Sequence, residues 1–135
     1  LPYLQQKGKH AYDINLEVYI EPENVEPTLV SKSNFKYMYW SMSQQLAHHT
    51  SNGCRVNSGD MMGSGTISGP TPDSFGSMLE LTWGGKNPIK MADGTERKFI
   101  NDNDTVIMKG YCQNSSLRIG FGEVSSKLLP PFVRK

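Results

Sequence analysis

The residues with the clearest chemical potential lie between Gly63 and Trp83. Four glycines and two prolines fall between Gly63 and Gly76, and a short amphipathic run then carries one carboxylate, Glu80. Glycine permits positive φ angles and close backbone approach, so backbone N–H groups in such a loop can turn toward an anionic ligand. The sequence therefore predicts an anion-binding loop beside an acid. Such a loop and acid would supply only part of an active site, because the chain offers no convincing partner for the Glu80 carboxylate.

Glu80 has two interpretations. In an expected strand over residues 77–83, Glu80 shares a face with Met78 and Thr82, and the pattern alone favours a solvated carboxylate on the outer face. If Met78 instead indicates that this face is partly covered, the carboxylate needs a cation or an imidazole as its partner, because burying it unpaired is costly. A glutamate held against a histidine is one way to orient a general base.

Thr66 and Gly65 are candidates for binding a substrate. The Thr66 hydroxyl and the neighbouring amides could bind a carboxylate, although the bare sequence slightly favours a plain strand end with turn glycines. The stretch lacks the Gly-x-Ser-x-Gly pattern of serine hydrolases and the lysine of a phosphate loop. No Asp, Glu or His grouping has a recognisable metal-ligand spacing, so no metal ligand is assigned to this chain.

The composition indicates a single domain over residues 1–135. The chain is 36% hydrophobic and 20% charged, with a net charge of +1 and no cluster of basic residues. Nucleic acid and membrane are therefore not expected as partners. The spacing of Cys54 and Cys112 fits neither a disulfide framework nor a zinc site, which favours reduced, partly buried thiols in a cytosolic protein. Because the chain opens on Leu1 and Pro2 without a methionine, we expect it to begin inside a longer protein.

Hydrophobic periodicity predicts a β-rich roll or sandwich with one principal helix near residues 34–50. Asp93 and Gly94 have the form of a type I′ hairpin turn. His48 and His49 are adjacent and so cannot clamp a metal from one helix face, but they suit the negative end of the helix dipole. The expected strands are 12–20, a short one at 29–30, 60–68, 77–83, 89–92, 96–100, 105–112 and 117–124.

Motifs along nearly the whole chain resemble one family. The most distinctive are Ser-Gly-Thr-Ile-Ser-Gly-Pro at 64–70 and Phe-Gly-Ser-Met-Leu-Glu-Leu at 75–81. Matching blocks also occur at 1–4, 13–16, 32–40, 44–46, 48–49, 52–54, 97–99, 110–113 and 118–122, in the family's order. With these motifs the chain resembles the C-terminal part of the catalytic domain of the fumarylacetoacetate hydrolase family. It departs from the family at 5–11, 21–29, 95–96 and 130–135, which are loop-like.

The resemblance implies a mixed β-sandwich roll and a hydrolase. Family members cleave a carbon–carbon bond of 4-fumarylacetoacetate to give fumarate and acetoacetate, the last step of tyrosine and phenylalanine catabolism. A water activated by a His–Glu pair attacks a carbonyl, and a divalent cation, Ca²⁺ or Mg²⁺, stabilises the charge that develops. Glu80 matches the glutamate that orients the catalytic histidine, and Thr66, with Gly65 beside it, matches the substrate-binding threonine.

The resemblance also implies what this chain lacks. The family's catalytic histidine and metal ligands belong to earlier segments, so the chain alone is expected to be inactive, and the intact enzyme is expected to be a cytoplasmic homodimer. Two alternatives remain. The parent protein could be a related diketo-acid hydrolase, such as an acylpyruvate hydrolase, or a decarboxylase, and the free chain could be a non-catalytic β-rich remnant.

Overall fold

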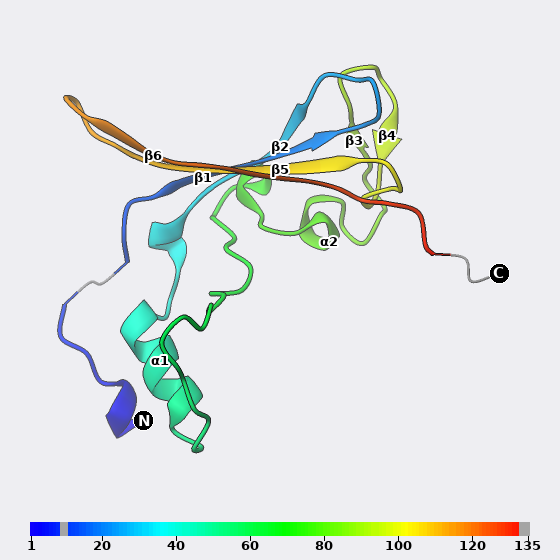
Figure 1. The fold of residues 1–135 in the computed structure, drawn as a ribbon. Coiled ribbons are helices and arrows are strands. Elements are labelled where there is room, and N and C mark those ends of the chain that lie inside the picture. Colours follow the sequence, from blue (N-terminus) through cyan, green and yellow to red (C-terminus); the bar gives the residue numbers. More distant parts are fainter. Residues whose placement is uncertain (9–10, 133–135) are drawn as a thin grey trace.

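The computed structural model describes residues 1–8 and 11–132. A four-stranded antiparallel sheet in the order β2-β1-β5-β6 crosses the molecule, and a two-stranded hairpin lies beside it (Figure 1). The strands are β1 (Asn15–Glu21), β2 (Thr28–Asn34), β3 (Ile89–Lys90), β4 (Glu96–Arg97), β5 (Thr105–Gln113) and β6 (Arg118–Lys127). The prediction of a β-rich fold with one principal helix is confirmed.

The alternating pattern of β1 was interpreted correctly. Ile20 is only 1% exposed and forms the hydrophobic core with Val30 and Met91, and Val18 packs against this cluster. On the other face, Glu17 accepts hydrogen bonds from the hydroxyls of two tyrosines, Tyr19 and Tyr111, at 2.8 and 3.2 Å. Period-two alternation thus separates an apolar face from a polar one, as expected for a half-buried strand.

The predicted helix begins later than expected, at Met42. Asn34 ends β2, a 3₁₀ turn follows at Phe35–Tyr37, and the helix α1 covers Met42–Thr50. Ser41 is its N-cap and forms a capping box with Gln44, which fixes the first helical residue. Apolar residues within the predicted helix range 34–50 are mostly exposed, with Phe35 as the buried exception. The reason is that α1 packs on the N-terminal turn Pro2–Leu4 and stands away from the sheet (Figure 1).

Two predicted strands are wrong. Residues 60–68 have no regular structure, and residues 77–83 contain the short helix α2 (Met78–Leu81). Ser77 is the N-cap of α2, and its side chain accepts a hydrogen bond from the N–H of Glu80. The cap stabilises a helical turn where the alternation of polar and apolar residues indicated a strand.

The β3–β4 hairpin is confirmed, but its turn is not type I′. That turn requires a positive φ at both central residues, and Gly94 has one (φ 83°) whereas Asp93 does not. The Asp93 carboxylate accepts hydrogen bonds from the hydroxyl and the N–H of Thr95, at 2.7 and 2.9 Å, and they lower the pKa of Asp93. This local bond pattern is an Asx turn, which selects a different backbone conformation.

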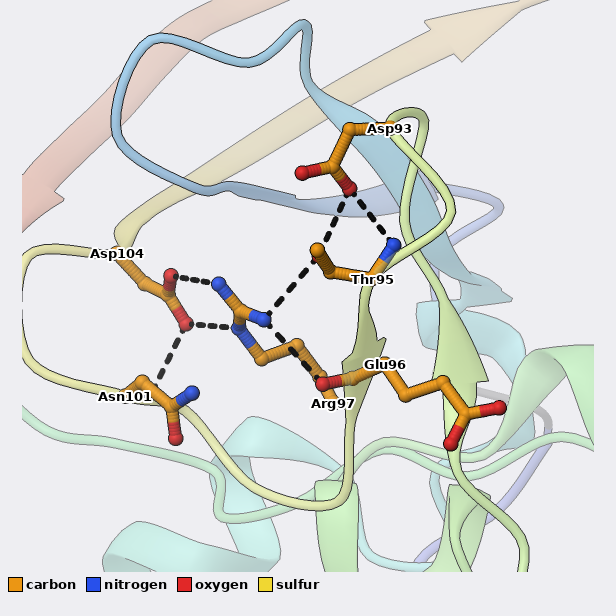
Figure 2. A network of polar contacts seen from close by, with 6 residues as sticks. All are labelled: Asp93, Thr95, Glu96, Arg97, Asn101 and Asp104. Carbon is orange, nitrogen blue, oxygen red and sulfur yellow. Dashed lines mark hydrogen bonds and ion pairs between the residues drawn. The ribbon is translucent and has the colours of Figure 1, made fainter.

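An ion pair ties the hairpin to the start of β5. Figure 2 shows the guanidinium of Arg97 facing the carboxylate of Asp104 through two parallel bonds, Nε to Oδ2 at 2.9 Å and Nη2 to Oδ1 at 3.0 Å. The N–H of Asn101 donates to the same carboxylate at 2.9 Å. The side chains of Arg97 and Asp104 are 13% and 2% exposed, so this bidentate pair is largely shielded from water.

The outer strand β6 is exposed along its whole length. The β5–β6 register shifts between Lys109 and Tyr111, opposite Gly122, which has a φ of 79°, so the strand pair contains a bulge there. Three apolar side chains of β6, Ile119, Phe121 and Val124, are more than half exposed. In the part of the chain that the structure describes, no helix has the length and apolar character needed to cross a bilayer.

Candidate functional site

Two loop segments are held side by side by serines of β2. Ser31 and Ser33 are buried, and they donate hydrogen bonds to the backbone carbonyls of Phe75 (2.7 Å) and Ile67 (3.1 Å). Residues two apart on a strand point to the same face, so one face of β2 fixes both segments. The N–H of Gly69 also donates to the carbonyl of Ser74 at 2.8 Å, which closes the loop between the segments.

Gly76 is a point of close approach between the two segments. A Cβ atom built on Gly76 would lie 2.6 Å from the carbonyl oxygen of Ile67 and 2.7 Å from Cγ2 of Thr66. The N–H of Gly76 donates to Oγ of Ser68 at 3.1 Å. The absence of a side chain at Gly76 therefore lets the backbone carrying Thr66 and Ser68 lie against the start of α2.

Replacement of Gly76 by alanine is expected to destabilise the protein by about 1–3 kcal/mol, because the new methyl group would clash with backbone that cannot move away freely. Urea unfolding of the complete protein measures this change. Gly63→Ala is the matched control, since a Cβ at Gly63 has no atom within 4 Å. Equal stability of the two variants would contradict the close approach at Gly76.

Glu80 does not share a face with Met78 and Thr82. Met78 begins α2, and Thr82 is the residue just after its end. The two lie four residues apart and so on one side of the helix, where Met78 packs against the core and Thr82 is 0% exposed. The Thr82 hydroxyl donates to the carbonyl of Met78 at 2.7 Å. Glu80 lies on the other side and is exposed. The favoured interpretation of Glu80 as a solvated carboxylate is confirmed, and the alternative of a partly covered Glu80 is wrong because it assumed the period of a strand.

The Glu80 carboxylate is nevertheless held in place by two hydroxyls. Oγ of Ser68 lies 2.8 Å from Oε2 and 3.0 Å from Oε1, and Oγ of Ser77 lies 2.9 Å from Oε2. Within the described residues, no lysine, arginine or histidine forms an ion pair or hydrogen bond with this carboxylate. Glu80 is thus oriented yet remains open to a further donor.

Thr66 and Glu80 line the same cleft, whose volume is about 570 Å³. Thr66 is exposed, and no hydrogen bond to its hydroxyl is found among the described residues. Gly65 precedes it with a φ of 81°, a conformation that favours glycine, but it does not line the cleft. The segment 37–40 also lines the cleft, and Ile67, Ser68, Ser77 and Leu79 complete the described lining.

A larger depression of about 1040 Å³ lies between the N-terminal segment and residues 36–44. Among the described residues that line it, none carries a carboxylate, imidazole or thiol. His48 lies outside both depressions, in the last turn of α1 as expected, and contacts the Tyr3 hydroxyl through Nδ1 at 3.1 Å. We therefore place the candidate active site in the smaller cleft, where Glu80 and Thr66 meet.

Sequence reasoning missed Ser68 and Ser77 as members of this site. For Ser77 a signal was present, since Ser77-Met-Leu-Glu80 has the Ser-x-x-Glu form of a helix start. For Ser68 there was none, because its partner Glu80 is twelve residues away and is reached only through the folded loop.

Comparison with known proteins identifies the family. The family model described as fumarylacetoacetate (FAA) hydrolase C-terminal matches residues 4–128. The chain belongs to the fumarylacetoacetate hydrolase family. It is 53% identical over 131 residues to the fumarylacetoacetase of Homo sapiens, 52% over 133 residues to that of Dictyostelium discoideum and 50% over 131 residues to that of Oryza sativa. Each alignment covers 96% of this chain but only 30–31% of the relative's own length.

Membership of the fumarylacetoacetate hydrolase family confirms the resemblance seen in the sequence, and the match includes Gly65, Thr66 and Glu80. The divalent cation that the resemblance implied does not fit the described residues by themselves. No group of three or more His, Cys, Asp or Glu side chains within residues 1–8 and 11–132 could hold a metal ion. Among the described residues that line the cleft, Glu80 alone carries such a side chain, and Ca²⁺ or Mg²⁺ needs several oxygen ligands.

Proposed function

We propose that this chain is the C-terminal part of a hydrolase that cleaves 4-fumarylacetoacetate into fumarate and acetoacetate, the last step of tyrosine and phenylalanine catabolism. The observation that carries the proposal is the Glu80 carboxylate, fixed by Ser68 and Ser77 in the cleft that Thr66 also lines. The fumarylacetoacetases that match this chain supply the substrate class.

Glu80 acts in this proposal through a histidine from outside the chain. Its carboxylate accepts the N–H of the imidazole, holds the ring in one tautomer and stabilises the imidazolium that forms when the other ring nitrogen takes a proton from water. The water then attacks the substrate carbonyl. An exposed, oriented carboxylate without a cationic partner among the described residues suits this role.

Thr66 and Gly65 bind the substrate in the same proposal. The Thr66 hydroxyl is exposed in the cleft and free to donate to a substrate carboxylate. The positive φ of Gly65 turns the backbone just before Thr66 and so sets the direction of the neighbouring amides.

We also propose that the complete enzyme holds Ca²⁺ or Mg²⁺ through ligands outside this chain. Such an ion would supply charge stabilisation for the substrate oxygens. Metal analysis of the purified complete enzyme, and reactivation of chelated enzyme by each ion, test this point. No residue of this chain is assigned to the coordination.

A homodimer in the cytoplasm completes the proposal. The exposed apolar side chains of β6 provide a surface that a second subunit could cover, and light scattering on the complete protein gives its oligomeric state. Cell fractionation tests the location.

The substrate is tested with a panel of diketo acids and the complete protein. We expect the highest kcat/KM for 4-fumarylacetoacetate, above that for acylpyruvates and above any decarboxylation. A clear preference for another diketo acid would replace the proposed substrate. Turnover by the isolated 135-residue chain would refute the claim that the base lies outside it.

Thr66→Val is expected to raise KM by about tenfold with a smaller change in kcat. The variant keeps the size of the side chain but loses one hydrogen bond to a charged substrate group, which is made in both ground and transition states. Steady-state kinetics of the complete enzyme measure both constants. Thr50→Val is the control, because the Thr50 hydroxyl contacts only backbone carbonyls of α1 among the described residues. An unchanged KM in Thr66→Val would remove Thr66 from the substrate site.

A further inference from the structure

Ser68 joins the glycine-rich loop to the catalytic carboxylate. It is partly buried, and its hydroxyl accepts the N–H of Gly76 at 3.1 Å while lying 2.8 Å from Oε2 of Glu80. A hydroxyl has one proton and two acceptor lone pairs. Since Gly76 donates to Ser68, the Ser68 proton is left to point at the carboxylate.

Ser77 also contacts this oxygen. Its Oγ lies 2.9 Å from Oε2 of Glu80, so the two shortest contacts of the carboxylate both fall on Oε2. The contact from Ser68 to Oε1 is longer, at 3.0 Å. One proton cannot serve both oxygens fully, so Oε2 is the anchored oxygen and Oε1 is the one left to accept from another donor.

We propose that Ser68 and Ser77 are positioning residues that anchor Oε2 of Glu80, so that Oε1 accepts the N–H of the catalytic histidine. This proposal rests on the proposed function and names the groups that orient the glutamate. Ser77 also caps α2, and its loss would weaken that helix. Ser68 does not belong to α2, and so it separates positioning from helix stability.

The test uses the complete enzyme with Ser68→Ala and Ser68→Thr. We expect Ser68→Ala to lower kcat by about tenfold, the cost of one hydrogen bond to a charged group, with KM changed by less than about twofold. Ser68→Thr, which keeps the hydroxyl, should recover most of kcat.

A double-mutant cycle decides whether Ser68 acts through Glu80. In a Glu80→Gln background, Ser68→Ala should have less than about a twofold effect on kcat, because the charge that it orients is already absent. An equal loss in both backgrounds would overturn the proposal and assign Ser68 a structural role. Ser51→Ala is the matched control, since the Ser51 hydroxyl donates to a backbone carbonyl at the end of α1.

Crystal structures of wild type and Ser68→Ala distinguish failure of the positioning role from failure of the proposed function. If the wild type does not hydrolyse 4-fumarylacetoacetate, the function fails, and positioning is judged from the carboxylate itself. We expect Oε2 of Glu80 to leave its place in Ser68→Ala and to stay there in Ser68→Thr. A carboxylate that keeps its orientation without the Ser68 hydroxyl overturns the inference whichever substrate is used.

Discussion

Replacement of Glu80 by glutamine is expected to lower kcat of the complete enzyme at least about a hundredfold while leaving its stability nearly unchanged. The amide keeps the size of the side chain and can still accept from Ser68 and Ser77. It carries no charge, however, so it cannot stabilise an imidazolium, and it can hold the histidine in the wrong tautomer. Glu80 is exposed and packs on no core residue, so folding should not depend on its charge.

Steady-state kinetics and thermal unfolding of the same preparation test this expectation. Glu96→Gln is the matched control, because Glu96 is an exposed glutamate on the β3–β4 hairpin whose side chain points away from the Arg97 network (Figure 2). A Glu80→Gln enzyme with wild-type kcat would contradict the proposed role of Glu80 in the reaction. A large loss of stability in that variant would instead make Glu80 a structural residue.

Removal of the Asp104 carboxylate is expected to cost about 3–5 kcal/mol of unfolding free energy, the typical cost of leaving one member of a buried ion pair alone. Asp104→Ala would leave the shielded guanidinium of Arg97 without its carboxylate partner and the N–H of Asn101 without its acceptor. Chemical denaturation of the complete protein measures the loss. Asp102→Ala, an exposed aspartate in the same turn, should change stability by less than about 0.5 kcal/mol.

The pH dependence of stability gives a second measure of the same pair. Burial by itself would raise the pKa of Asp104, but the hydrogen bonds from Arg97 and Asn101 and the charge of Arg97 outweigh it, and the pKa is lowered. A lowered folded-state pKa means that the stabilisation is complete above the unfolded value of about 3.9 and is lost as the pH falls through the folded value. The stability difference between wild type and Asp104→Ala should therefore shrink below about pH 4. A difference that stays constant down to pH 2 would contradict this coupling.

Local patterns determined the elements that are long or bounded by strong turn signals. The alternation of β1 survives in the structure because one face meets the core residues Val30 and Met91 and the other meets polar side chains. The hairpin around Gly94 also formed where expected, since its turn residues favour a turn through their own backbone and side-chain chemistry.

Short elements were decided by caps rather than by periodicity. Residues 77–83 alternate like a strand, yet the cap at Ser77 makes four of them helical. In the same way Ser41 and Gln44 set the start of α1, so the apolar residues before it never joined the helix. Both caps have the capping-box spacing in the sequence, and counting that signal before periodicity would have placed both helix starts correctly.

Motifs in the amino-acid sequence were enough to establish the family, because residue identity in matched motifs carries that information. The same motifs led to Glu80 and Thr66 as the proposed site residues. It could not determine how Glu80 is held. Ser31 and Ser33 of β2 bind two loop segments that lie more than thirty residues further along the chain, and this tertiary contact brings Ser68 to the carboxylate. Hydrogen bonds between segments so far apart leave no trace in local periodicity, so only the folded loop shows that the hydroxyls of Ser68 and Ser77 hold the Glu80 carboxylate.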